Sequence, residues 1–459
     1  MKKYSTKFWV TFLIGSILFL TSWFIYWEVR HQGFESLKRL LGLAPIARET
    51  KTDLETVMSL ADAVLYTEGK EKVFLILFQN NLELRPGGGF IGSFGILKVR
   101  DGNIVEFAVH DTGNFDGRIP STVSPPYPMK ETLRIDSWKL RDSNYAPDFG
   151  ENAKWAETFY HMGQGAEQFD GVVAVTTNVL TSLLRVTGPI TIEGFPGTYG
   201  ADNAILDLEY QVEQGYLKQN IAFGERKSVM NILGLEILKH VKELSLSKKY
   251  ELFGVILNDL HEKDIQLSFK DEVLQEQVAV SGWDGKMDTN WKNDYLFVVD
   301  ANLNSFKTDY FMKRSYAYMI DLTADAPRAT LAVTYTNTTK VRDWFAKDYQ
   351  TFFRVYVPSG SYLNKVTNGA KDPVFGELLG KKYFGVLVQV PILTEKTVVF
   401  EYTLPSTFKK EWYDLKIQKQ PGLSDVPVTV TVIKKDSSKE EKQFILNRDT
   451  ILGELSDTK

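Results

Sequence analysis

The stretch from Lys72 to Asp111 constrains the fold of this chain more than any other. It begins with an apolar run, Val73 to Phe78, that predicts a buried strand. A polar elbow, Gln79 to Pro86, and three consecutive glycines, Gly87 to Gly89, follow, after which Phe90 to Val99 alternates small and large apolar residues. The dipeptide Asp101-Gly102 then favours a tight turn between two strands. We therefore predict three strands of one sheet, connected by a glycine-rich corner and a hairpin.

The glycine-rich corner is the first candidate site. Glycines let backbone N–H groups approach a ligand, and a guanidinium beside them can bind an oxyanion, so Arg85 suits a phosphate-bearing ligand. The alternative is a structural loop in which Arg85 pairs with Glu83. The candidate ligand-binding residues of the corner are Asn80, Asn81, Glu83, Gly87, Gly88, Gly89 and Ser93.

An uncharged apolar run, Phe8 to Trp27, is long enough to cross a bilayer as a helix. Three lysines precede the run, which by the positive-inside rule places residues 1–7 in the cytoplasm. A cleaved signal peptide is the alternative, but the run does not end in a small-residue cleavage site. We therefore expect a single-pass transmembrane helix at 8–27, with the rest of the chain on the extracytoplasmic side of a cell membrane.

Composition excludes several kinds of site. The chain contains no cysteine, which removes disulfides, thiolate nucleophiles and zinc–sulfur sites. The net charge is -4, and no basic run is interleaved with aromatic residues, so we expect no nucleic-acid partner. The five histidines are scattered, without a pair at metal-binding spacing. The glycine run also lacks the Gly-Lys-Ser/Thr that would complete a Walker loop.

The order of the expected elements predicts two folded domains after a stalk. Residues 28–68 have apolar residues at helical spacing, which predicts a helical stalk that docks onto the next domain. Residues 69–305 alternate strand and helix patterns, which indicates an α/β domain with a mixed sheet flanked by helices. Residues 312–435 contain seven short strand patterns and no strong helix, which is typical of an antiparallel immunoglobulin-like β-sandwich. Residues 436–459 are charged and predict a C-terminal tail.

A second group of candidate site residues follows the hairpin. A long irregular stretch contains Arg141, Asp142 and Asn144, and Asp148 lies just beyond it. Loops of this length are often functional, and these residue types bind cations or phosphate groups. Turn residues with local capping and one surface ion pair are the alternative. Arg226 lies near the start of an expected helix, where the helix N-terminus favours anions.

The residues from Gln79 to Ser93 resemble the Asn-Asn-x-Glu-x-Arg-x-x-Gly-Gly-Phe-Ile-Gly-Ser signature of an uncharacterised bacterial family. Members of that family are membrane-anchored and carry a domain of unknown function. The resemblance extends to Trp138–Asp148, Asp170–Thr176 and the turn Thr187-Gly188-Pro189, and covers roughly residues 70 to 305. It implies a location in the cell envelope and no particular activity.

The order of elements is also distantly similar to that of the LytR–CpsA–Psr phosphotransferases, which move glycopolymers from lipid pyrophosphate carriers onto the bacterial wall. In that family a strand pair leads to an Arg-Asp-Thr motif, which here reads His110-Asp111-Thr112. Glu225-Arg226 takes the place of a later arginine-bearing motif. The first motif lacks its arginine here, so the resemblance implies Asp111 and Arg226 as catalytic candidates. We add Arg85 and Arg141 as the arginines that would compensate for the missing one.

Two hypotheses follow. In the first, the three arginines clamp a pyrophosphate on a lipid-linked glycan or cell-wall polymer, while Asp111 or Asp142 holds a divalent cation such as Mg²⁺. Phosphoryl transfer depends mainly on positioning and charge stabilisation, which such groups supply. In the second, the chain is a non-catalytic envelope protein that binds a glycan or protein partner and presents a β-sandwich.

Overall fold

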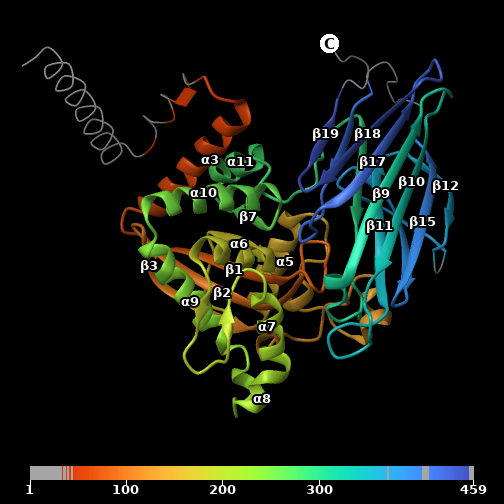
Figure 1. Ribbon diagram of the computed structural model, residues 1–459. Coiled ribbons are helices and arrows are strands. Elements are labelled where there is room, and N and C mark those ends of the chain that lie inside the picture. The colour runs from red at the N-terminus through yellow and green to blue at the C-terminus, as the bar shows by residue number, and fades with distance from the viewer. Residues whose placement is uncertain are drawn as a thin grey trace, which may run out of the picture.

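The structure, a computed structural model, describes residues 34, 38, 41–42, 45–369, 372–405 and 413–453 (Figure 1). The expected cytoplasmic segment at 1–7 and the expected membrane span at 8–27 lie outside these residues. Within the described part of the chain, no helix combines the length and the apolar character that a membrane crossing requires.

The first folded part is an α/β domain built on a five-stranded mixed sheet. β1 and β4 run parallel, and the other neighbouring strands are antiparallel. The three strands expected between Lys72 and Asp111 are all present. In spatial order the strands are β3 (Asn103–Asp111), β2 (Phe90–Arg100), β1 (Lys72–Asn80), β4 (Gly171–Thr176) and β7 (Ile265–Phe269).

Helices cover both faces of this sheet (Figure 1). Side chains alternate between the faces of a strand, so Leu75 and Leu77 share one face of β1 and pack in a core with α5 (Phe149–Met162). Phe78 belongs to the opposite face, which a second group of helices covers. This group comprises α6 (Thr177–Thr187), α7 (Ala204–Tyr210), α9 (Ser228–Glu243) and α10 (Leu246–His261).

A long helix, α3 (Arg48–Leu65), lies within the expected stalk and docks onto the domain. Thr56 Oγ1 donates to the carbonyl of Gln277 at 3.2 Å, in α11 (Glu272–Val280). Asp53 lies 2.9 Å from the ring nitrogen Nε2 of His261. The remaining short α-helices and strands of this part are α4 (Thr112–Asp116), α8 (Tyr216–Lys218), β5 (Ile190–Thr191) and β6 (Thr198–Tyr199).

The second part is a β-sandwich of two six-stranded sheets whose inward side chains form one core. The first sheet contains, in spatial order, β12 (Tyr362–Thr367), β15 (Thr394–Thr403), β10 (Arg328–Asn337), β9 (Met312–Asp321), β17 (Val426–Ile433) and β18 (Lys439–Leu446). The second contains β13 (Val374–Leu378), β14 (Lys381–Val390), β11 (Tyr349–Pro358), β8 (Asp294–Val299), β16 (Leu415–Gln418) and β19 (Thr450–Leu452).

This sandwich differs from the expected seven-stranded antiparallel one. β8, which was expected in the α/β domain, pairs with β11 and β16 in the sandwich. The pairs β8–β16 and β9–β17 are parallel. Residues expected to form a charged tail supply β18 and β19. β18 is an edge strand with alternate residues exposed, so its charged residues face solvent and make the segment resemble a tail.

The elbow and the three glycines join the two parts. Leu84 is fully buried in the core of the sandwich, and its carbonyl accepts a 2.9 Å hydrogen bond from the backbone N–H of Asn302. Gln420 Nε2 donates to the carbonyl of Arg85 at 3.1 Å. A Cβ at Gly422 would lie 2.0 Å from the carbonyl oxygen of Gly88, so the two backbones touch. The glycine run therefore serves close packing between the domains.

We predict that Gly422→Ala loosens this junction. Gly422 has φ +77°, and Gly380, in a β-hairpin turn, has φ +72° with no atom within 4 Å of an added Cβ. Both substitutions place alanine in a strained backbone region at a cost of about 1 kcal/mol. Only Gly422→Ala also clashes with Gly88, which adds about 2 kcal/mol. Equilibrium denaturation of the two variants measures the difference, and equal losses of stability would contradict the contact.

Candidate functional site

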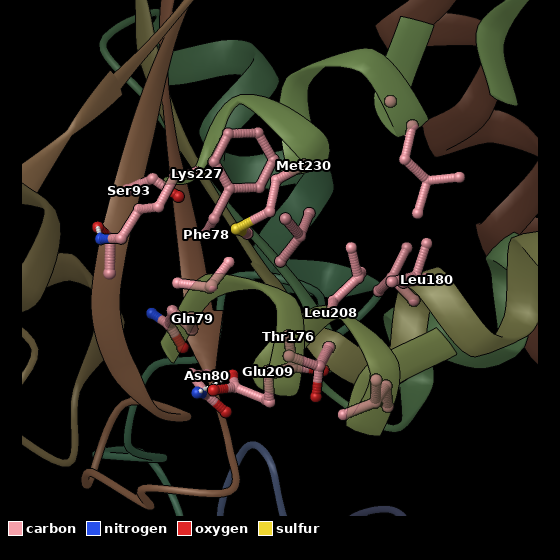
Figure 2. Close-up of a pocket in the computed structure, with 18 of the residues that line it drawn as sticks. Phe78, Gln79, Asn80, Ser93, Thr176, Leu180, Leu208, Glu209, Lys227 and Met230 are labelled. Carbon is pink, nitrogen blue, oxygen red and sulfur yellow. Dashed lines mark hydrogen bonds between the residues drawn. The ribbon is translucent and has the colours of Figure 1, made fainter. Parts of the chain in front are cut away.

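A cavity of about 350 Å³ lies between the sheet and the helices α6, α7 and α9 (Figure 2). Its walls are mainly apolar because each surrounding element turns its apolar side toward it. The apolar lining residues are Phe78, Phe90, Phe107, Val109, Val175, Val179, Leu180, Leu183, Ile205, Leu208, Val212, Met230, Leu233, Ile237 and Leu238. Met230 and Leu238 are each 36% exposed, so the cavity opens to solvent along α9. Such a space suits an apolar ligand or chain.

Polar side chains gather at the end of the cavity next to the elbow. Figure 2 shows Gln79, Asn80 and Glu209 together there, with Ser93 and Lys227 on the neighbouring strand and helix. Asn80 Nδ2 donates to Glu209 Oε1 at 2.7 Å. Of the residues predicted from sequence to bind a ligand, Asn80, Glu83 and Ser93 line the cavity. The combination of an apolar wall and one polar end fits an amphipathic molecule.

Lys307 is the central cation of this polar end. Its Nζ lies 3.2 Å from Glu83, 3.4 Å from Glu209 and 3.8 Å from Glu213. Burial raises the pKa of Glu209 to about 7, against the opposing effect of the Lys307 charge. The pKa of Lys307 is raised, because the three carboxylates outweigh the effect of burial. Lys307 therefore stays protonated and is surrounded by acid groups.

Asp111 and Arg226, two of the predicted catalytic residues, lie beside the cavity and are each paired. Asp111 Oδ2 lies 2.5 Å from Lys227 Nζ. Burial opposes ionisation of Asp111, but the Lys227 ammonium outweighs it and the pKa of Asp111 is lowered. Arg226 precedes α9, pairs with Glu213 at 3.1 Å and packs against the ring of Phe223. Neither residue lines the cavity itself.

Arg85, another predicted catalytic residue, is buried in the junction. It is 4% exposed, and its Nε donates to Asp142 Oδ1 at 3.0 Å. Its Nη1 donates to the carbonyl of Asn302 at 2.9 Å. Arg85 thus pairs with Asp142 rather than with Glu83. The contacts of its guanidinium hold the elbow against the sandwich, and the side chain does not line the cavity.

The other residues predicted near the corner also make internal contacts. Arg141 pairs with the buried Asp116 at 2.5 Å, and the pKa of Asp116 is raised by burial in spite of that partner. Asn144 Nδ2 donates to the carbonyl of Gly89 at 2.5 Å. Asp148 caps the start of α5 by accepting from the N–H of Glu151. Asn81 donates to the carbonyl of Gly422 at 3.0 Å. The structure therefore groups Arg85, Arg141, Asp142 and Asn144 around the corner, and Asp111 and Arg226 around Lys227.

The described residues do not fit the expected divalent cation. Asp111 and Asp142, the predicted metal ligands, pair with Lys227 and Arg85 respectively. Across the part of the chain that the structure describes, no three histidine or acidic side chains are arranged to hold a metal ion.

Sequence reasoning missed the cavity and most of its polar end. Gln79, Glu209, Glu213 and Lys307 were not candidates, although Gln79 begins the elbow. The apolar positions of α6 and α9 have the spacing of ordinary core residues, because a cavity wall and a packed core use the same residue types. The local signals were the candidates Asn80, Glu83 and Ser93, which line the cavity, and Lys227, which does so next to the candidate Arg226.

Comparisons with known proteins find a match to one family model over part of the chain, and no activity. Residues 69–212 match the family model described as "Protein of unknown function (DUF4012)", which covers less than half of the 459 residues. The expected resemblance to a domain of unknown function is confirmed at this level, whereas the LytR–CpsA–Psr resemblance stays a prediction. No curated protein matches the chain.

Two solved structures are distantly similar. The Lin1025 protein from Listeria innocua is 12% identical with a TM-score of 0.27, over 47% of this chain and 79% of that chain. Protein gbs0355 from Streptococcus agalactiae is 13% identical with a TM-score of 0.30, over 49% of this chain and 76% of that chain. Similarity this low carries no argument about function.

We predict that Asp142→Ala destabilises the protein by about 3–5 kcal/mol, because it leaves the buried Arg85 charge without its partner. Asp136→Ala is the matched control, since Asp136 is 96% exposed and its 3.9 Å pair with Lys130 contributes at most about 1 kcal/mol. Adding Arg85→Met to Asp142→Ala should recover part of the loss. Chemical denaturation measures all three, and a loss for Asp142→Ala as small as the control's would contradict the structural role.

Glu209 predicts a dependence of stability on pH. Its pKa is raised from 4.5 to about 7, so between these values the folded protein holds a proton that the unfolded chain releases. This contribution to stability is complete below pH 4.5 and is lost as the pH rises through 7. Glu209→Gln should make the unfolding free energy fall less steeply over this range, by up to about 1.4 kcal/mol per pH unit. Denaturation curves at several pH values test this, and parallel curves would contradict it.

Proposed function

We propose that this protein binds an amphipathic lipid, with the apolar chain in the cavity and the head group at its polar end. The observation that carries the proposal is the cavity itself, which joins a largely apolar lining to a cluster of polar side chains beside the elbow. Its volume of about 350 Å³ lies within the range of small-molecule sites. The opening along α9 gives a lipid chain a route of entry.

The proposed setting is the extracytoplasmic side of a bacterial cell membrane. The apolar run Phe8 to Trp27 supports this setting, because an anchor would keep the cavity near the lipids that it binds. A lipid-linked glycan or cell-wall polymer is the ligand that the resemblance to the LytR–CpsA–Psr phosphotransferases favours. The β-sandwich would then project from the membrane-anchored domain as an interaction module.

We favour binding over phosphoryl transfer. The arginines proposed to clamp a pyrophosphate each have a carboxylate partner: Arg85 contacts Asp142, Arg141 contacts Asp116, and Arg226 contacts Glu213. A phosphate group would have to break these ion pairs before it could bind to the arginine side chains. Transfer of a LytR–CpsA–Psr type would therefore need a rearrangement of the site, whereas binding of a chain needs none.

A substitution that fills the cavity tests the proposal. Leu180 lines the wall on α6, and Leu180→Trp should weaken binding of a chain-only probe, such as a pyrene-labelled alkane, by at least about tenfold, or about 1.4 kcal/mol. Titration of probe fluorescence with the purified full-length protein measures this affinity.

Leu217→Trp is the matched control, because Leu217 is 63% exposed and lies outside the lining. It should bind the probe like the wild type. A thermal melt confirms that both variants are folded. Lack of probe binding by the wild-type protein, or equal binding by both variants, would contradict the proposal.

A further inference from the structure

The charge at the polar end of the cavity is already balanced within the protein. The cations there are Lys307, Lys227 and Arg226, and each contacts a carboxylate within 3.2 Å. The carboxylates that surround them are Glu83, Glu209, Glu213 and Asp111. An anionic head group would meet no uncompensated cation among these groups. It would also approach several acidic oxygens, which repel it.

Gln79 is the polar group at this end that lacks a partner. It lines the cavity and is 2% exposed, and neither its amide nitrogen nor its amide oxygen has a hydrogen-bond partner among the described residues. A buried polar group without a partner is rare in folded proteins, because it loses its hydrogen bonds to water. A ligand that supplies these bonds removes the cost.

The glycine corner places Gln79 where a ligand can meet it. A Cβ at Gly88 would lie 1.9 Å from Gln79 Oε1, so the side chain rests directly against the glycine backbone. Asn80, the next residue, donates to Glu209, and the buried Ser93 lines the same end. The amide, hydroxyl and carboxyl groups together offer both donors and acceptors to one head group.

We propose that the head group bound here is uncharged and carries hydroxyl groups, as in a long-chain alcohol or a glycolipid, and that Gln79 is the residue that recognises it. A hydroxyl both donates and accepts, so it can bond to the amide oxygen and the amide nitrogen of Gln79. A phosphate monoester at neutral pH is predominantly an acceptor and carries between one and two negative charges. This inference rests on the proposed function, since it assumes that the apolar chain lies in the cavity.

Three ligands with the same chain test the head group. Calorimetric titration of the full-length protein with decan-1-ol, decyl glucoside and decyl phosphate compares them directly. The alcohol is kept below its solubility limit, and the other two are kept below their critical micelle concentrations. We expect the alcohol or the glucoside to bind at least tenfold more tightly than the phosphate. If decan-1-ol binds more tightly than decyl glucoside, the natural ligand is a free long-chain alcohol. If the glucoside binds more tightly, it is a sugar-bearing lipid. Tighter binding of the phosphate would overturn the inference, whatever the behaviour of any variant.

Gln79→Leu tests the role of the side chain. It should weaken binding of the preferred neutral ligand about tenfold and leave binding of decyl phosphate unchanged. Gln211→Leu is the control, because Gln211 is also 2% exposed and has an unpartnered amide nitrogen among the described residues, but does not line the cavity. It should leave all three affinities unchanged.

The outcomes separate the two proposals. If Gln79→Leu weakened the binding of all three ligands equally, the role of Gln79 would be purely structural. That result would overturn the proposal that Gln79 recognises the head group. Failure of every ligand and of the chain-only probe to bind the wild type would overturn the proposed function together with this inference. Binding of the chain-only probe with no preference among head groups would overturn this inference alone.

Discussion

The buried ion pair between Arg85 and Asp142 is the interaction on which the arrangement of the two parts depends. A guanidinium that is almost fully enclosed needs a charged partner and further acceptors. Asp142 and the carbonyl of Asn302 provide them, one from the α/β part and one from the segment between β8 and β9 of the sandwich. The elbow therefore cannot move away from either part without exposing or stranding a charge. The same rigidity fixes Gln79, a few residues earlier, at the end of the cavity.

The cavity lies beside this rigid junction and on the face of the sheet opposite α5. The sheet provides a fixed wall, whereas α6, α7 and α9 close the other side. The polar end is attached to the elbow, and the opening lies along α9, where lining residues are partly exposed. Under the proposed function, the head group would lie against the stiff region and the chain would enter past the more exposed helices.

The sequence predicted the local elements well where one period dominated. The strands around the glycine run and most helices follow from alternation or helical spacing. It predicted less where contacts between distant residues decide the outcome. Nothing near Arg85 indicates that its partner is Asp142, and β8 resembles any buried strand until its neighbours are known. A glycine run is equally consistent with ligand binding and with tight packing. Here Gly88 packs tightly against Gly422, which lies far along the chain and could not be identified as its neighbour from the local sequence.

The parallel pairs in the sandwich have a consequence for how the protein is made. β17 lies between β9 and β18, and β16 lies between β8 and β19, so these four strands complete one edge of each sheet. Gln420, which follows β16, also supplies the hydrogen bond to the carbonyl of Arg85. The elbow is thus synthesised well before Gln420, which supplies one of its native contacts. A chain that lacked the strands β16 to β19 would expose part of the hydrophobic core of the sandwich to solvent.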